Sequence, residues 1–360
     1  MLSGGVVRAV APSAGLTDTQ RLLVQAVFSA MTGFPATLDA PGLDPESFAH
    51  ALATRNLEFR TRIVQIMILL GLVLRPLPAE VASRIAAYAS ELCVEDGMLE
   101  VARRFAEGSL GLAAFDFERN GYTASWDEQA ARSLHTTAPL QGAWELAPAD
   151  EGLAEQWVSL EGYPPDTMGR LVTEFYRARG FSYPGRPGSA PPLLAQHDWV
   201  HVLADYGTTV ESELEVFAFI ARANDDLRAF SLLAMVVSLF ETGYLRTGAG
   251  LFESSPGHLS EPGMATRVAD AMFRGAKCEG SIDFMRINWF ELAAVPVEEA
   301  RRHFGVVPKS EDAVRSGSVG PWEPGGISPF QVRSGTALAE LEGRPYQSFG
   351  ASVAERSPAT

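Results

Sequence analysis

A short stretch of the chain carries two histidines one helical turn apart. His197 and His201 are four positions apart, and Asp198 lies between them. On a helix, residues at this spacing share a face, so both imidazoles would point the same way. Two neutral imidazoles one turn apart are a common way to hold a divalent cation. The spacing therefore predicts part of a metal site.

Glu213 is the best candidate for a further ligand. It follows His201 after eleven intervening residues. Gly207 allows the chain to turn between them, and Thr208 or Thr209 can cap the helix that follows. We expect Glu213 near the first turn of that helix, where it can return toward His201. A mixed set of nitrogen and oxygen ligands suits zinc and also accepts iron or manganese.

Asp198 has two interpretations. It lies about 100° around the helix from His197. It binds the metal if the helix begins at this point; otherwise it hydrogen-bonds a ligand histidine and orients it. The predicted metal ligands are His197, Asp198, His201 and Glu213, with zinc as the expected ion. No general acid or base is evident beyond these residues.

The elements around this motif are predicted to be helical. Apolar residues recur at three and four positions through most of the chain, and alternating strand patterns are almost absent. We expect an all-α protein with two helical domains, at residues 18–120 and 155–307. A segment rich in Ser, Thr, Pro and Gly predicts a linker at 121–154. The composition of residues 308–360 predicts a flexible tail.

Composition excludes several classes of protein. The 360 residues have a formal net charge of −15, which argues against binding to nucleic acid because phosphate binding relies on clustered Lys and Arg. The two cysteines, Cys93 and Cys278, are too few for a disulfide scaffold or a Cys-rich zinc site. No apolar run reaches the ~20 residues of a membrane span. The N-terminus lacks the pattern of a secretory signal, so a cytoplasmic protein is expected.

The motif and its surroundings resemble the family of the fourth Coq protein of ubiquinone (coenzyme Q) biosynthesis. The resemblance rests on His-Asp-x-x-His, eleven residues and Glu, and on residues 165–176, 201–208 and 289–301. It covers about residues 155–307. Asp205 stands where the family usually has glycine. The N-terminal domain lies outside the resemblance; it is similar to TerB-like domains in its helix order and its turn at Glu95-Asp96-Gly97.

The resemblance implies an all-α fold, a metal on the four motif residues and a groove for a polyprenyl tail. It implies removal of the C1 carboxylate of a polyprenylated hydroxybenzoate, by a protein peripheral to the inner membrane that meets other proteins of quinone biosynthesis. Apolar residues at 210–244 are candidates for the groove, although core packing is the ordinary role for most of them. The resemblance leaves open whether the protein forms a homodimer.

Two other functions compete with this one. The first is a non-catalytic scaffold that binds a prenyl lipid and whose metal only fixes two helices. An open coordination position would distinguish catalysis from this role. The second is an HD-type phosphohydrolase, suggested by His197-Asp198. It is disfavoured because the second histidine at i+4 departs from the pattern of those enzymes.

Overall fold

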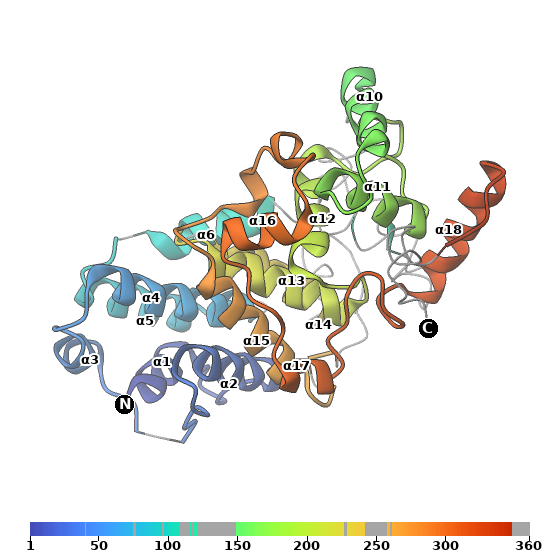
Figure 1. The fold of residues 1–360 in the computed structure, drawn as a ribbon. Coiled ribbons are helices and arrows are strands. Elements are labelled where there is room, and N and C mark those ends of the chain that lie inside the picture. The colour runs from blue at the N-terminus through green and yellow to red at the C-terminus, as the bar shows by residue number, and fades with distance from the viewer. Residues whose placement is uncertain are drawn as a thin grey trace. The chain divides into compact units, whose positions relative to one another are not determined.

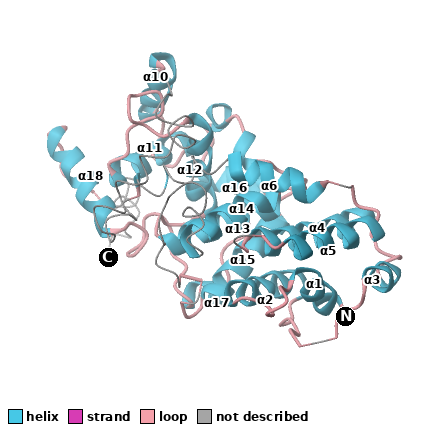
Figure 2. Ribbon diagram, turned by 180° about the vertical axis from the view of Figure 1, so that it is seen from behind, coloured by secondary structure: helices cyan, strands magenta, loops and turns pink. Residues whose placement is uncertain are grey.

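The computed structural model describes residues 1–39, 41–74, 77–95, 97–108, 116, 119–120, 149–226, 229–241, 258–259 and 261–347. Over this part of the chain the structure is all-α, as predicted. Figure 2 shows helices and loops, and the described residues contain no strand. One isolated backbone bridge joins Thr167 and Pro296.

The chain forms two compact units, and each is assembled from separate stretches of sequence. The first unit contains Met1–Leu110, Phe217–Ala276 and Lys309–Ser316; the second contains Gly111–Val216, Lys277–Pro308 and Gly317–Thr360. The sequence predicted consecutive domains at 18–120 and 155–307 instead. The contacts follow a different division because the apolar helices after residue 217 pack with the N-terminal helices.

The first unit is built around a helix that is buried on every side. It contains α1 (Leu2–Val10), α2 (Asp18–Thr32), α3 (Pro45–Ala51), α4 (Leu57–Leu72), α5 (Ala79–Glu91), α6 (Met98–Gly108), the second half of α13 (Val210–Ala223), α14 (Ala229–Glu241), α15 (Met264–Lys277) and α17 (Glu311–Arg315) (Figure 1). Every residue of α4 from Arg62 to Leu72 is buried. A helix apolar all round is typical of a domain core. Helices α1, α2, α5, α6 and α14 pack around it.

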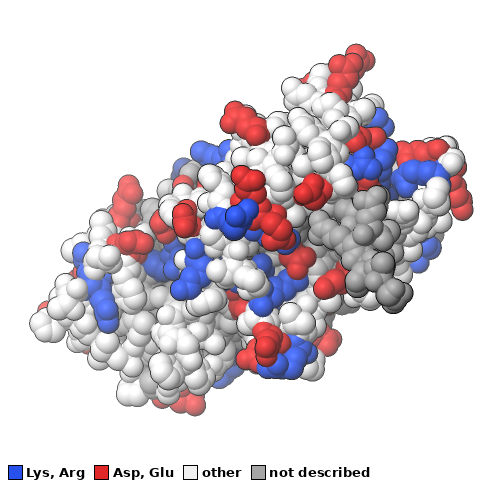
Figure 3. All heavy atoms as spheres, in the orientation of Figure 1, with Lys and Arg blue, Asp and Glu red and all other residues white. Residues whose placement is uncertain are grey.

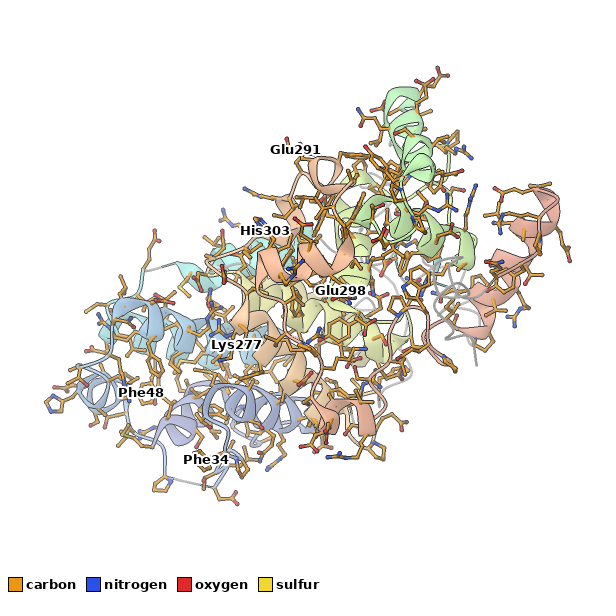
Figure 4. The ribbon with its side chains drawn as sticks, viewed as in Figure 1. Phe34, Phe48, Lys277, Glu291, Glu298 and His303 are labelled. Atoms are coloured by element: carbon orange, nitrogen blue, oxygen red, sulfur yellow. The ribbon has the colours of Figure 1, made fainter. Side chains whose placement is uncertain are left out.

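Close packing and one half-buried ion pair stabilise this unit. The ring of Phe48, labelled in Figure 4, fills the space beside Gly5 of α1, where a Cβ atom would lie 2.2 Å from it. The guanidinium of Arg62 pairs with Asp225 and donates to the backbone oxygen of Asn224. The turn at residues 95–97, on which the likeness to TerB-like domains rests, includes Asp96, which lies outside the described residues.

The second unit surrounds the predicted metal motif. It contains α10 (Glu151–Ser159), η3 (Leu160–Gly162), α11 (Met168–Arg179), α12 (Pro192–Ala204), the first half of α13, η5 (Phe284–Arg286), η6 (Trp289–Leu292), α16 (Val297–Phe304) and α18 (Pro329–Leu341). Stacked aromatic rings form much of its core; Trp199 and Trp289 lie nearly parallel with centroids 5.8 Å apart. Helix α10 begins at Glu151, inside the predicted linker, whose residues 121–148 lie outside the described part.

The prediction of a flexible tail is wrong over residues 311–341, which include α17 and α18. Ser328 begins α18 with a capping box to Gln331, and Pro329 occupies its first position. Gln331 is fully buried. The backbone of α18 lies directly on the end of α11: a Cβ atom on Gly335 would lie 2.3 Å from the backbone oxygen of Ala178. Helix α18 is therefore packed into the second unit, whereas α17 belongs to the first.

Two surface properties bear on function. Acidic and basic side chains are interspersed over the face that Figure 3 shows. Within the described residues, no helix is both long enough and apolar enough to cross a membrane.

The contact between α11 and α18 gives a test of the ordered tail. Gly335→Ala would place a methyl group against the Ala178 carbonyl and should cost about 1–3 kcal/mol of unfolding free energy, as overpacking does. Urea unfolding and proteolysis of residues 317–347 measure this. The control is Gly162→Ala, because no atom lies within 4 Å of a Cβ there. Equal stability of the two variants would contradict the close packing of α18.

Candidate metal centre

Helix α12 carries both histidines on one face. Pro192 occupies its first position, and the helix ends at Asp205, whose φ of 62° is left-handed. The backbone N–H of Tyr206 donates to the oxygen of His201 and closes the last turn. The two imidazole centroids lie 5.2 Å apart, as the i, i+4 spacing predicts.

The end of α12 is also held from α16. Arg301 donates from Nε to the backbone oxygen of Leu203 and from Nη2 to that of Val202. A cation at this position favours the helix C-terminus because it faces carbonyls with no partner inside the helix. Glu298, labelled in Figure 4, accepts from Arg301 and keeps it in place.

A tight corner joins α12 to α13. Asp205 takes the left-handed conformation that glycine adopts most easily, which accounts for glycine at this place in the resembled family. The backbone N–H of Gly207 donates to Val319, and that of Thr208 donates to Gly326. The side chain of Thr209 accepts from the N–H of Ser212 in the first turn of α13. This corner places Glu213 one turn into α13, where the sequence predicted it.

His197, His201 and Glu213 converge inside the second unit. Oε2 of Glu213 lies 3.5 Å from Nε2 of His197 and 3.4 Å from Nε2 of His201. All three side chains are buried, with exposed fractions of 1% or less. The predicted return of Glu213 toward His201 is what the structure shows.

Each imidazole is oriented so that its Nε2 faces the carboxylate of Glu213. Nδ1 of His197 donates to the backbone oxygen of Leu194 at 2.5 Å, and Nδ1 of His201 donates to that of Tyr206 at 3.3 Å. A carbonyl can only accept, so each Nδ1 carries a proton. In the neutral rings Nε2 then keeps its lone pair, which is the arrangement that metal-binding histidines use.

The geometry and the donor set fit a divalent cation. Two ligands each about 2.1 Å from a tetrahedral ion lie about 3.4 Å from each other. The distances from Oε2 of Glu213 to the two imidazole nitrogens, 3.5 and 3.4 Å, match this separation. Nε2 of His201 and both carboxylate oxygens of Glu213 are buried without a well-aligned hydrogen bond. Buried polar atoms of this kind need an explanation, and a bound cation provides one.

Asp198 lies beside His197 at the edge of this cluster. Its Oδ1 lies 3.7 Å from Nε2 of His197. Both of its oxygens accept hydrogen bonds: Arg119 donates to Oδ1 at 2.6 Å and to Oδ2 at 3.0 Å, and the Tyr176 hydroxyl donates to Oδ2 at 2.5 Å. Helix α12 begins six residues earlier, so Asp198 lies inside the regular helix, and its carboxylate forms with His197 and His201 a group that could hold a metal. The bonds from Arg119 and Tyr176 favour its other predicted role, beside a ligand histidine.

Asp116 is a candidate ligand that the sequence analysis missed. Its Oδ1 lies 3.8 Å from Nε2 of His197, and it forms a possible metal group with His197 and Glu213. It accepts from Nε of Arg119 at 2.9 Å and from the side chain of Asn120 at 3.0 Å. Nothing in the local sequence marks it, because it reaches the cluster only through the tertiary fold.

The electrostatics of the cluster are those of crowded carboxylates. Burial alone would lower the pKa of His197, but the carboxylates of Asp198, Asp116 and Glu213 outweigh it and raise that pKa to about 9. Burial and the charge of Glu213 raise the pKa of Asp116. Burial opposes ionisation of Glu213, yet the neighbouring imidazoles hold its pKa below the usual value.

Arg119 stabilises the ionised form of Asp198. Burial would raise the pKa of Asp198, but the guanidinium and the nearby imidazole lower it overall. Burial and the charge of Asp198 raise the pKa of the Tyr176 hydroxyl well above its usual value, so Tyr176 keeps its proton and donates it. With neutral imidazoles, the cluster has three carboxylates and one guanidinium, an excess of negative charge that suits a divalent cation.

Comparison with known proteins adds little to this geometry. No protein-family model matches the chain, and no curated protein matches it. Among solved structures it is similar to a protein from Nostoc punctiforme PCC 73102 that is assigned provisionally to ubiquinone biosynthesis. The match has 16% identity and a TM-score of 0.31, and it covers 69% of this chain and 97% of the other. At that TM-score the likeness carries no argument about function.

Removal of one ligand gives the first test of the metal centre. The wild-type protein should bind about one equivalent of a divalent transition metal. Glu213→Gln and His201→Ala should lose most of it, because each removes a donor from a small buried set. Metal analysis after loading with Zn²⁺ measures this. Glu211→Gln is the matched control on the same helix and should keep the metal. Full metal content in Glu213→Gln would remove the assignment.

Asp116 and Asp198 should differ in what they support. Asp116→Asn should weaken metal binding by at least about ten- to a hundredfold, which is the effect of losing a group that supports a ligand. Asp198→Asn should mainly lower the melting temperature, because Arg119 and Tyr176 lose their acceptor. Competition with a Zn²⁺ indicator gives the affinity, and Asp166→Asn, an exposed carboxylate in the same unit, is the control. Unchanged affinity in Asp116→Asn would exclude Asp116 from the site.

Proposed function

We propose that this chain is a metal-dependent protein of ubiquinone or related prenylquinone biosynthesis, and that it removes the C1 carboxylate of a polyprenylated hydroxybenzoate. The observation that carries the proposal is the convergence of His197, His201 and Glu213, with Asp198 beside them, in a buried cluster. These are the positions at which the chain matches the His-Asp-x-x-His-x11-Glu motif of the fourth Coq protein.

The residues of the cluster have separate tasks in this proposal. Nε2 of His197, Nε2 of His201 and a carboxylate oxygen of Glu213 hold the ion, and Asp116 adds a further oxygen. Asp198 and Tyr176 orient Arg119 and keep water from the ligands. A bound divalent cation supplies a Lewis acid that stabilises negative charge on the ring or its phenolate. The balanced reaction releases the carboxylate as CO₂ and adds one proton at C1.

The lipid character of the substrate supports a place at a membrane surface. A polyprenyl tail resides in a bilayer, so a protein that acts on the ring meets the substrate at the interface. This is the basis for proposing peripheral association with the inner membrane and contact with other proteins of quinone biosynthesis.

A non-catalytic scaffold is the second candidate, and one observation favours it. Glu213 and both histidines are buried to within 1% of full exclusion from solvent, as in a closed structural metal site. In that function the ion fixes α12 against α13, and the unit binds a prenyl lipid without changing it.

Release of labelled CO₂ decides between the two. The zinc-loaded wild-type protein, given a short-chain prenylated hydroxybenzoate labelled at the carboxyl carbon, should release labelled CO₂ above the rate without protein. Glu213→Gln should lose at least about 100-fold of that rate, the scale of a lost electrostatic contribution, whereas Glu211→Gln should not. Fully loaded protein that releases none, with zinc, iron or manganese, would leave the scaffold function in its place.

A further inference from the structure

Two glutamines, Gln20 and Gln331, are fully buried although their side chains are polar. Each is the third residue of its helix and completes a capping box. Oε1 accepts from the backbone N–H of the N-cap residue, which is Thr17 in α2 and Ser328 in α18. The capping box uses only this oxygen, so Nε2 remains for other partners. The two glutamines differ in what that nitrogen bonds.

Gln20 uses its amide nitrogen to join helices. Nε2 donates to the backbone oxygens of Val10 in α1 and Leu70 in α4, at 3.0 and 2.9 Å. Both acceptors are main-chain groups of the first unit. These bonds therefore support packing and reach no candidate metal ligand.

Gln331 uses the same nitrogen to reach the metal cluster. Nε2 donates to Oδ1 of Asn120 at 2.6 Å and to the backbone oxygen of Thr208 at 3.3 Å. Asn120 in turn donates to Oδ1 of Asp116 at 3.0 Å. One side chain thus lies between the tail helix and a candidate ligand. Gln331, Asn120 and Asp116 all lie outside residues 155–307, so the resemblance described above does not imply this path.

The acceptors on Asp116 fix the direction of every bond along the path. Nδ2 of Asn120 faces the backbone oxygen of Asp116 at 2.9 Å as well as its Oδ1, and both are acceptors. Oδ1 of Asn120 therefore faces Gln331, which supplies the donor. Oε1 of Gln331 is then left to accept from the hydroxyl of Thr208 at 2.7 Å. Bonds ordered in one direction in a buried network strengthen one another.

This path determines how the carboxylate of Asp116 is held. A carboxylate has about four lone-pair positions. Arg119 and Asn120 each donate to Oδ1 and so hold one side of it. The same carboxylate forms a possible metal group with His197 and Glu213. Because the path is buried, water does not readily replace a lost bond, and the orientation of Asp116 depends on Asn120.

We propose that Gln331 is a positioning residue for the metal centre, acting through Asn120 to hold the carboxylate of Asp116 toward the ion. The inference rests on the metal centre of the proposed function and does not depend on the substrate. It gives α18, which carries no candidate ligand, a direct effect on the affinity for the metal.

The test measures zinc affinity of the full chain by competition with an indicator. Gln331→Met keeps the length of the side chain and removes its bonds, and it should weaken zinc binding about tenfold, as the loss of an outer hydrogen-bond partner does. Gln20→Met is the matched control. It loses the same capping bond and two buried bonds, so urea unfolding of the zinc-free protein should show both variants destabilised. Only Gln331→Met should lose zinc affinity.

A double-mutant cycle shows whether Gln331 acts through Asp116. Asp116→Asn combined with Gln331→Met should bind zinc no more weakly than Asp116→Asn alone, because the group that Gln331 positions is already changed. The loss of stability from Gln331→Met should be similar in both backgrounds. Co²⁺ gives a second readout, since its visible absorption depends on its ligands. The Co²⁺ spectrum of Gln331→Met should shift toward that of Asp116→Asn, whereas Gln20→Met should keep the wild-type spectrum.

Asn120→Leu breaks the same path without touching the capping box of α18. It should also weaken zinc binding about tenfold, and it serves as the test if Gln331→Met does not fold. Wild-type zinc affinity in Asn120→Leu would overturn the proposal. An equal loss of affinity from Gln331→Met in both backgrounds would overturn it as well, because Gln331 would then act through general stability.

The outcome is distinguishable from that of the proposed function. If the cycle is non-additive while loaded wild-type protein releases no labelled CO₂, the positioning role is confirmed and the decarboxylation is wrong. If the wild-type protein releases CO₂ and the cycle is additive, the decarboxylation holds and the positioning role is wrong. Wild-type protein that binds no metal would overturn both.

Discussion

The second unit is organised by a buried excess of negative charge. Asp116, Asp198 and Glu213 lie within a few ångströms of His197 and are almost completely removed from solvent. Isolated buried carboxylates cost several kcal/mol each. Arg119 compensates part of this by bonding two of them with three of its nitrogens. The remaining excess faces two imidazoles, and a divalent cation bound there would offset it.

The backbone around the cluster depends on a hydrogen-bonded chain that starts at the corner between α12 and α13. The hydroxyl of Thr208 donates to Gln331 of α18, and Gln331 donates to Asn120. Asn120 in turn donates to Asp116, which accepts from Arg119. Buried networks of this kind are stable when every member is satisfied. The tail helix is thereby joined to the metal cluster, although it supplies no candidate ligand.

Local periodicity was enough to predict that the candidate ligands on α12 and α13 lie close together. The i, i+4 spacing fixes the face that His197 and His201 share, and the Gly-Thr-Thr segment fixes the corner that returns Glu213. These relations lie within two consecutive helices, so residues close in sequence determine them. The all-α class follows in the same way from periodicity along each helix.

Long-range relations could not be predicted in that way. Arg119 meets Asp198 across 79 positions of sequence, and no local pattern encodes that contact. The tail was misjudged for a different reason. Its Gly, Ser and Pro content hid a signal that was present, namely Ser328 and Gln331 at capping-box spacing with Pro329 between them. The two predicted consecutive domains differ from the two observed units because the units depend on which apolar faces pack together. Helix α13 contributes to both units.

The role of Arg119 separates a structural metal site from a catalytic one. In a structural site the arginine only closes the cluster, and its exposed edge has no task. In a catalytic site that edge faces the substrate, because Arg119 lines a cavity of about 440 Å³ and bonds Asp198 at once.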